Sequence, residues 1–255
     1  GLFWWKDVPY PPQITVIAAL FALRRNQPLS AGDAKKLDRW FWCGVFGELY
    51  GSSTDTRLAN DVEDLMRWFG GETEPRTIGA ATFSESRLDT LYIRISAAYK
   101  GVHALLMKSG ARDFLTGERI DVANFFSENF DIHHIFPRAW CEAQKIPRER
   151  YNTIVNKSPL AARTNRKIGG RAPSSYCATL DKDTSAAGIS LDEILESHGI
   201  EPSRLRSDDF DSFYSARKVG LLSMIEQAMG KSALRDGEGR ADDYEEGEEE
   251  IEAAA

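Results

Sequence analysis

The chain has 255 residues, 42% hydrophobic and 28% charged, and a formal net charge of −7. These values are ordinary for a soluble globular protein and allow one sizeable core or two modest ones. No apolar stretch is long enough to cross a bilayer, and the first residues lack the basic and apolar regions of a secretory signal. We therefore expect no membrane association and a cytoplasmic location.

The three cysteines, Cys43, Cys141 and Cys177, are widely spaced and form no CxxC pair. An odd number of this kind argues against a disulfide framework and against a zinc knuckle, and it is typical of a reducing cytosol. We expect all three to be small, buried apolar residues rather than ligands.

Charge is distributed unevenly along the chain. From Asp236 onward there are ten acidic residues and one arginine, so the remainder of the chain carries a net charge of +2. This composition predicts a disordered acidic tail over 231–255. The stretch 138–171 holds nine lysines or arginines against two glutamates. Such a stretch is a candidate for phosphate contacts, and a solvated surface gives the same pattern.

The first part of the chain is predicted to be helical, from the spacing of its apolar residues. Helices are expected over 11–25, 33–51, 53–71 and 84–110. The first is apolar all round and begins with prolines, which predicts a buried helix. Asp33 is expected to cap the second, and Ser53 or Thr54 the third. His103 is given no chemical role.

The pattern changes after about residue 117. The stretch 129–170 predicts a strand, a helical or loop insertion, a second brief strand and a helix. Further helices are expected over 190–199, capped by Ser190, and 207–230, capped by Ser207.

Two of the four histidines are adjacent, in the stretch DIHHIFP. Neighbours on a strand point to opposite faces, so His133 and His134 can share a site only at a strand end or bulge, which Pro137 supports. Asn156 follows His134 by 22 residues, and Asn165 follows Asn156 by nine. This order suits phosphodiester hydrolysis, in which a neutral imidazole takes a proton from water and a divalent metal stabilises charge on the phosphate.

These residues resemble the C-terminal HNH nuclease region of GmrSD-type modification-dependent restriction enzymes and SspE-like phage-defence proteins. The motif HIFP matches the His-Xaa-Xaa-Pro signature, and VNKSPLAARTNRKIGGRAPSSY is similar to the segment that accompanies it. Upstream, KKLDRWFWCGVFGELYG and RLANDVEDL resemble the helices that precede this nuclease. The resemblance covers most of 1–214 and implies a longer protein with an N-terminal NTPase domain, whose nucleotide-binding motif is absent here.

The resemblance implies roles for individual residues. His134 corresponds to the general base, and His133 to a metal ligand in the slot before it. Asn156 matches the middle asparagine, which orients the base or reaches the metal. Asn165 stands where many HNH enzymes have a final histidine, and an amide ligand favours Mg²⁺ or Mn²⁺ over zinc. Asp131, two residues before His133, is a rival metal ligand.

DNA is the expected partner. Arg163, Arg166 and Lys167 on the predicted helix would contact phosphate, with Lys157 and Arg171 as weaker candidates. We expect a metal-dependent DNA endonuclease that nicks one strand, whereas a double-strand break would need two sites, as in a homodimer. A catalytically decayed DNA-binding module and an RNA-directed nuclease remain alternatives.

The expected fold is mainly α (α+β), a helical domain with a small embedded ββα-metal HNH core. We assign 1–116 to the helical domain, which would be the C-terminal part of a longer protein. The nuclease domain with flanking helices is assigned to 117–230, and the disordered acidic tail to 231–255.

Overall fold

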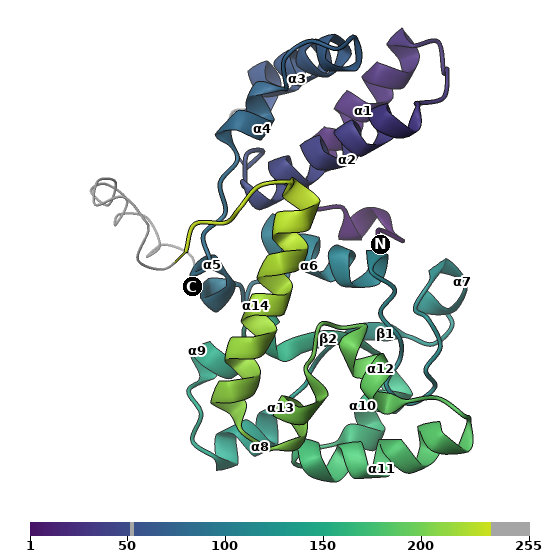
Figure 1. The fold of residues 1–255 in the computed structure, drawn as a ribbon, viewed down its shortest axis with the longest axis vertical. Coiled ribbons are helices and arrows are strands. Elements are labelled where there is room, and N and C mark those ends of the chain that lie inside the picture. Colours follow the sequence, from purple (N-terminus) through teal and green to yellow (C-terminus); the bar gives the residue numbers. More distant parts are fainter. Residues whose placement is uncertain (52–53, 236–255) are drawn as a thin grey trace, which may run out of the picture.

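The computed structural model describes residues 1–51 and 54–235. Within these ranges the protein is mainly helical and contains one two-stranded antiparallel sheet (Figure 1). The expectation of a mainly α fold is confirmed. The predicted cap at Ser53 and the acidic residues from Asp236 onward lie outside the described residues.

The elements follow one another as short and medium-length helices, with the two strands in the second half. The first half contains η1 (Trp5–Asp7), α1 (Pro11–Leu23), α2 (Ala31–Phe46), α3 (Thr54–Phe69), α4 (Arg76–Ala80), α5 (Arg87–Thr90) and α6 (Ala97–Lys108). The second half contains α7 (Val122–Phe125), β1 (Phe130–His134), α8 (Arg138–Ala143), α9 (Arg148–Tyr151), η2 (Ile154–Asn156), β2 (Lys157–Ala161), α10 (Ala162–Ile168), α11 (Pro173–Ala186), α12 (Leu191–Glu196), α13 (Pro202–Arg206) and α14 (Phe210–Met229).

Two helix starts differ from the sequence prediction. Ser30, not Asp33, caps α2, and its hydroxyl oxygen accepts a hydrogen bond from the Asp33 backbone N–H at 3.0 Å. Asp209, not Ser207, caps α14 in the same way, by accepting from the Ser212 N–H at 3.1 Å. In both cases several capping residues stand close together in the sequence, and only the backbone path selects one of them.

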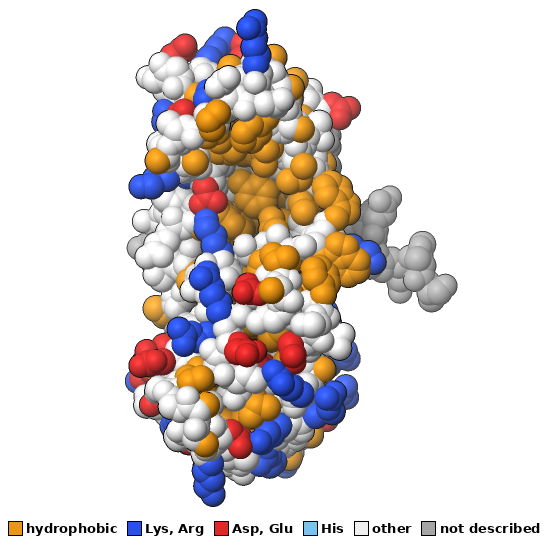
Figure 2. Space-filling view, turned by 90° about the vertical axis from the view of Figure 1, so that its right-hand side faces the viewer, with side chains coloured by type: hydrophobic (Ala, Val, Ile, Leu, Met, Phe, Trp, Pro, Cys, Tyr) orange, Lys and Arg blue, Asp and Glu red, His pale blue; other side chains and the backbone are white. Residues whose placement is uncertain are grey.

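The first helix is less buried than its composition predicts. Of the thirteen residues of α1, only Gln13, Val16 and Leu20 are buried, and Leu23 is 61% exposed. α1 packs against α3 along one side and lies at one end of the molecule. On the face drawn in Figure 2, hydrophobic side chains gather over the upper and middle parts of the surface. The expectation of a buried α1 was therefore wrong.

The longest helix, α14, connects the two halves of the molecule. It runs alongside the hairpin region and continues to the helices of the first half, where it packs against α2 and α6 (Figure 1). One hydrophobic core extends from Val16 to Ala233 and contains residues of both halves. The proposed division at 116/117 thus falls within a shared core and remains a prediction.

The hydrophobic core also accounts for the cysteines and for a close helix contact. Cys43, Cys141 and Cys177 are buried and free, as expected. A Cβ atom at Gly101 of α6 would lie 2.7 Å from the Val45 side chain of α2, so only glycine permits this approach. None of the helices in the described ranges combines the length and the apolarity that a membrane span requires.

Candidate active site

The hairpin places the adjacent histidines at the end of β1. Antiparallel pairing sets His134 opposite Lys157 and His133 opposite Ser158. α10 follows β2 without a break and packs against both strands. The predicted order of strand, insertion, strand and helix over 129–170 is confirmed, with α8 and α9 as the insertion.

His134 is oriented by a neighbour that the sequence did not indicate. Its Nε2 lies 3.3 Å from the Oδ1 of Asn152, and its ring meets Tyr151 edge-on, with the ring centroids 5.9 Å apart. An amide oxygen accepts, so Nε2 carries the proton and Nδ1 is left as an acceptor. Burial, and then the positive charge of Lys157, lower the pKa of His134 to about 4. The imidazole is therefore neutral at pH 7.

His133 and Asp131 differ in how fully their polar atoms are engaged. The Nε2 of His133 is inaccessible to solvent and has no hydrogen-bond partner among the described residues. Burial lowers the pKa of His133, so this ring too is neutral at pH 7. Asp131, by contrast, forms an ion pair with Arg94 and accepts from the Ile132 N–H at 2.7 Å. Both bonds of Asp131 go to its Oδ1, so each of the two rival ligands keeps one atom, the Nε2 of His133 and the Oδ2 of Asp131, without a partner among the described residues.

Asn156 is fully buried, and its side chain is committed to the backbone. Its Oδ1 accepts from the Phe136 N–H at 2.8 Å, and its Nδ2 donates to the carbonyls of Phe136 and Tyr151, both at 3.0 Å. These bonds join the segment after β1 to the turn before β2. Asn156 therefore holds the backbone at the His134 end of the hairpin in place. Its amide group is used up by these bonds and is not available to a ligand.

A second buried network holds the junction of β2 and α10. The Oδ2 of Asp113 accepts from the Ala161 N–H at 3.0 Å, and its Oδ1 from the Thr164 hydroxyl at 2.6 Å. Asp113 is 1% exposed and also accepts from two backbone N–H groups of its own turn. A carboxylate with this many donors fixes the direction in which α10 leaves the strand.

The buried His198 supports β2. Its Nδ1 lies 2.6 Å from the Ser158 hydroxyl and its Nε2 lies 2.6 Å from the Arg112 carbonyl. The carbonyl accepts, so Nε2 donates and Nδ1 accepts the serine proton. Burial lowers the pKa of His198 to about 3, so the ring stays neutral. Ser158 is the cross-strand partner of His133.

Lys157, expected as a weaker DNA contact, is almost entirely buried. It is 7% exposed, and its Nζ lies over the Tyr99 ring, 5.8 Å from the centroid. Burial, and then the charge of Arg94, lower its pKa to about 8. Lys157 therefore lies beside His134 and beneath α6. Its charge acts on the histidine, and little of its side chain is open to solvent.

The other predicted DNA contacts differ in availability. Arg163 pairs with Glu128 at 3.2 Å and Lys167 with Asp183 at 2.6 Å. Arg171 bonds to backbone carbonyls at the end of α10 and to Thr179. Arg166 is exposed and has no side-chain partner within the described ranges. Of these side chains, Arg166 is the one most open to an anion.

The residues around the hairpin offer few ligands for a divalent metal. Within 1–51 and 54–235, no group of three or more His, Cys, Asp or Glu side chains is arranged to hold an ion. The predicted ligands are His133, Asp131 and the amide of Asn165, and α10, which carries Asn165, packs against β1. Carboxylate and amide oxygens together with water would suit a hard ion such as Mg²⁺, which retains several waters, better than zinc.

The residues that the sequence did not identify come from distant segments. Asn152 lies 18 positions from His134, Asp113 lies 51 from Thr164 and His198 lies 40 from Ser158. None belongs to a recognisable spacing motif. Each is a polar residue among apolar neighbours in the sequence, which is a weak signal because many residues with a purely structural role have it too.

Comparisons with known proteins give little functional information. No family model matches the chain. An uncharacterized protein of Methanocaldococcus jannaschii is 30% identical over 192 residues, which are 73% of this chain and 31% of that protein. The chain thus spans about a third of the length of the curated relative that it matches.

Proposed function

We propose that the protein is a metal-dependent endonuclease of the HNH type that hydrolyses one strand of DNA. The observation that carries this proposal is the hairpin β1–β2 followed directly by α10, with the adjacent histidines at the end of β1. The family resemblance of the same segment supports it. The proposal includes the expected phage-defence role and the expected NTPase domain elsewhere in a longer protein.

In the proposed reaction, His134 is the general base. Its Nε2–H donates to Asn152, so Nδ1 is free to accept the proton of a water molecule that attacks phosphorus. A new P–O bond forms as the bond from phosphorus to the 3′ oxygen breaks, and the leaving oxygen takes a proton from solvent. The products are a 5′-phosphate and a 3′-hydroxyl.

His133 and Asn165 are the residues that would hold the metal, with Asp131 as a rival for His133. A bound divalent ion would stabilise the negative charge on the phosphate and on the leaving oxygen. Among the predicted phosphate contacts, Arg166 is the exposed and unpaired one. Lys157 contributes positive charge beside His134.

The test is nicking of supercoiled plasmid in Mg²⁺ or Mn²⁺. We expect His134→Ala to lower the rate by about 10²–10⁴-fold while DNA binding and the melting temperature stay close to wild type, because a positioned base contributes that much. Undiminished cutting by this variant contradicts the assignment.

A companion pair of variants tests the metal ligands. Asn165→Ala should weaken Mn²⁺ binding, measured by calorimetry. Asn60→Ala is the matched control, since Asn60 is also a half-buried asparagine in a helix, in α3. If the wild type binds no Mn²⁺ and cuts neither plasmid nor single-stranded RNA, the decayed DNA-binding module is favoured instead. Cutting of RNA alone favours the RNA-directed nuclease.

A further inference from the structure

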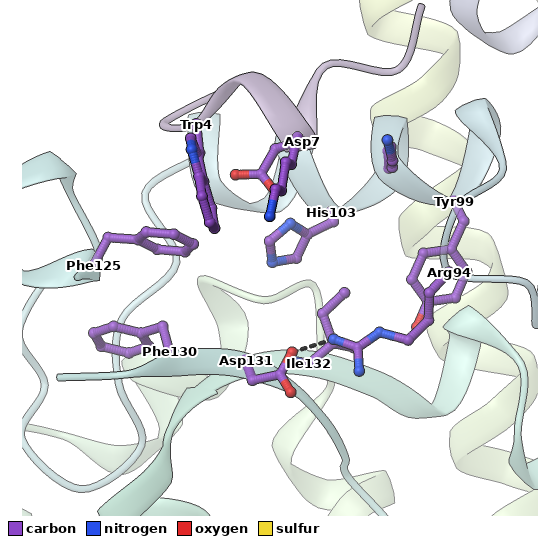
Figure 3. Close-up of a pocket in the computed structure, with 11 residues that line it drawn as sticks. Trp4, Asp7, Arg94, Tyr99, His103, Phe125, Phe130, Asp131 and Ile132 are labelled. Carbon is purple, nitrogen blue, oxygen red and sulfur yellow. Dashed lines mark hydrogen bonds and ion pairs between the residues drawn. The ribbon is translucent and has the colours of Figure 1, made fainter.

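A cavity lies beside β1, at the end of the strand away from His134. It has a volume of about 310 Å³ and lies between the N-terminal segment, α6 and β1. We call it the β1 cavity. Figure 3 shows that Trp4, Asp7 and His103 line one side of it and that Asp131 and Ile132 line the other. A volume of this size is in the range of sites for small organic molecules.

Aromatic rings form much of its wall. Trp4, Tyr99, Phe125 and Phe130 all line it, and the rings of Phe125 and Phe130 are nearly parallel, at 8° with centroids 6.5 Å apart. Trp4 is 50% exposed, so its ring forms an open edge rather than part of the core. Such rings favour a flat, unsaturated ligand, which can stack on them.

Two polar groups at the cavity are buried and unpaired. Tyr99 is 0% exposed, and its hydroxyl has no hydrogen-bond partner among the described residues. The same is true of the Nε2 of His103, whose ring projects into the cavity between Trp4 and Asp131 (Figure 3). Burial lowers the pKa of His103 to about 4, so the ring is neutral at pH 7. Unpaired groups of this kind are costly unless a ligand or water satisfies them.

The charged side chains that line the cavity have a net positive charge. Arg94 is paired with Asp131. Lys6 and Lys100 then face the single carboxyl group of Asp7, whose pKa is raised by burial. The Lys6 Nζ lies 4.5 Å from the centroid of the Trp4 ring, so a cation and an aromatic face occupy the same edge of the cavity.

A ligand that suits all three features is a nucleobase carrying a phosphate. A purely apolar ligand leaves the Tyr99 hydroxyl and the His103 nitrogen unpaired, and a phosphate alone leaves the rings unused. A nucleobase stacks on the rings, offers donors and acceptors at its edge, and places its phosphate within reach of Lys6 and Lys100. Asp131 and His134 are three residues apart on one strand, about 10 Å, which corresponds to one or two nucleotides.

We propose that the β1 cavity receives an unstacked nucleobase of the nucleic-acid strand, close to the scissile phosphate that the proposed function would bring to the end of β1. The placement near a scissile phosphate rests on the proposed function, whereas recognition of a nucleobase by the cavity does not depend on cleavage. The cavity would thus select a strand position where one base is unpaired or easily turned out of the stack.

The test compares a fluorescent single-stranded 12-mer with the same strand bearing abasic sites, in EDTA so that nothing is cut. Wild type should bind the base-bearing strand about tenfold more tightly, since one stacked base contributes an effect of this order. Trp4→Ala should abolish that preference. Trp5→Ala is the matched control, because Trp5 is the neighbouring residue, is 60% exposed and does not line the cavity.

A second variant separates a base within a strand from a free nucleotide. Lys100→Ala should weaken binding of a deoxynucleoside monophosphate several-fold and leave binding of the corresponding nucleoside unchanged, whereas the exposed Lys182→Ala should change neither. Competition by the monophosphate against the 12-mer, lost in Trp4→Ala, indicates that free nucleotides use the same cavity. If the monophosphate does not compete while wild type still prefers the base-bearing strand, the cavity accepts a base only as part of a strand.

Equal affinities for the base-bearing and abasic strands, or equal behaviour of Trp4→Ala and Trp5→Ala, would overturn the proposal. The outcome is separable from that for the nuclease. Plasmid nicking without a base preference removes the cavity assignment alone. A base preference in a protein that cuts no nucleic acid removes the nuclease assignment alone.

Discussion

The polar residues around the hairpin β1–β2 fall into two groups. In the supporting group, Asn156, Asp113 and His198 are at most 1% exposed, and each makes at least two hydrogen bonds. In the group proposed for chemistry, His134 makes one side-chain hydrogen bond, at 3.3 Å, and the Nε2 of His133 has no hydrogen-bond partner among the described residues. These two histidines are neighbours in a regular strand, so their side chains leave opposite faces of the hairpin.

This difference separates residues that determine geometry from residues that remain available. A buried polar group with every partner in place stabilises one arrangement of the backbone. A half-buried group with an unused donor atom adds little stability, and it is free to bind a ligand or a proton. The stretch 129–170 therefore contains residues of both kinds, with Asn156 in the supporting group.

Replacement of Asn156 should have the largest effect on stability. Asn156→Ala leaves the Phe136 N–H and the Tyr151 carbonyl without a side-chain partner in the core and the Phe136 carbonyl with the Cys141 thiol alone, which should lower the free energy of unfolding by about 2–4 kcal/mol. Urea denaturation measures this loss. His134→Ala, in the group proposed for chemistry, should change the same quantity by less than about 1 kcal/mol. Equal losses for the two variants would contradict the comparison.

The buried His198 should make stability depend on pH. Its pKa of about 3 in the folded state is below the ordinary value of 6.5, so the unfolded chain binds the proton first as pH falls. Stability is therefore present above pH 6.5 and is lost between about pH 6 and pH 3, with a slope of up to about 1.4 kcal/mol per pH unit.

His198→Gln removes this titration and should reduce the slope of unfolding free energy against pH by up to about 1.4 kcal/mol per pH unit over that range, while His103 and His134, whose pKa values are lowered to about 4, still contribute to it. The lost hydrogen bonds lower the stability of the variant at pH 7. Denaturation at several pH values checks the slope. A variant curve parallel to that of wild type would show that His198 does not titrate in this way.

The smallest effect concerns Asn152, a positioning residue that acts through His134. Asn152→Ala should lower kcat about tenfold and leave KM near its wild-type value, because the imidazole loses its orientation while the substrate contacts remain. Asn152→Asp should move the acidic limb of the pH–rate profile upward, since a carboxylate raises the pKa of His134. An unchanged pH profile for the aspartate variant would remove the positioning role.

The sequence alone determined most of the local structure of this protein. Apolar spacing predicted the helices, strand-like composition up to Pro137 predicted β1, and the β-branched composition of 151–160 and the helical character of 161–170 predicted β2 and α10. These signals are local, since they depend on the 3.6-residue and two-residue periods of the chain.

Only the tertiary structure decided burial and pairing. α1 and α14 show this, because the apolar α1 is largely at the surface while Arg217 of α14 is 1% exposed. The contact of Asn152 with His134, that of Asp113 with Thr164, and the β1 cavity likewise join segments far apart in the sequence. Such contacts depend on how the helices pack around the hairpin, and the local periodicity of a chain does not specify that packing.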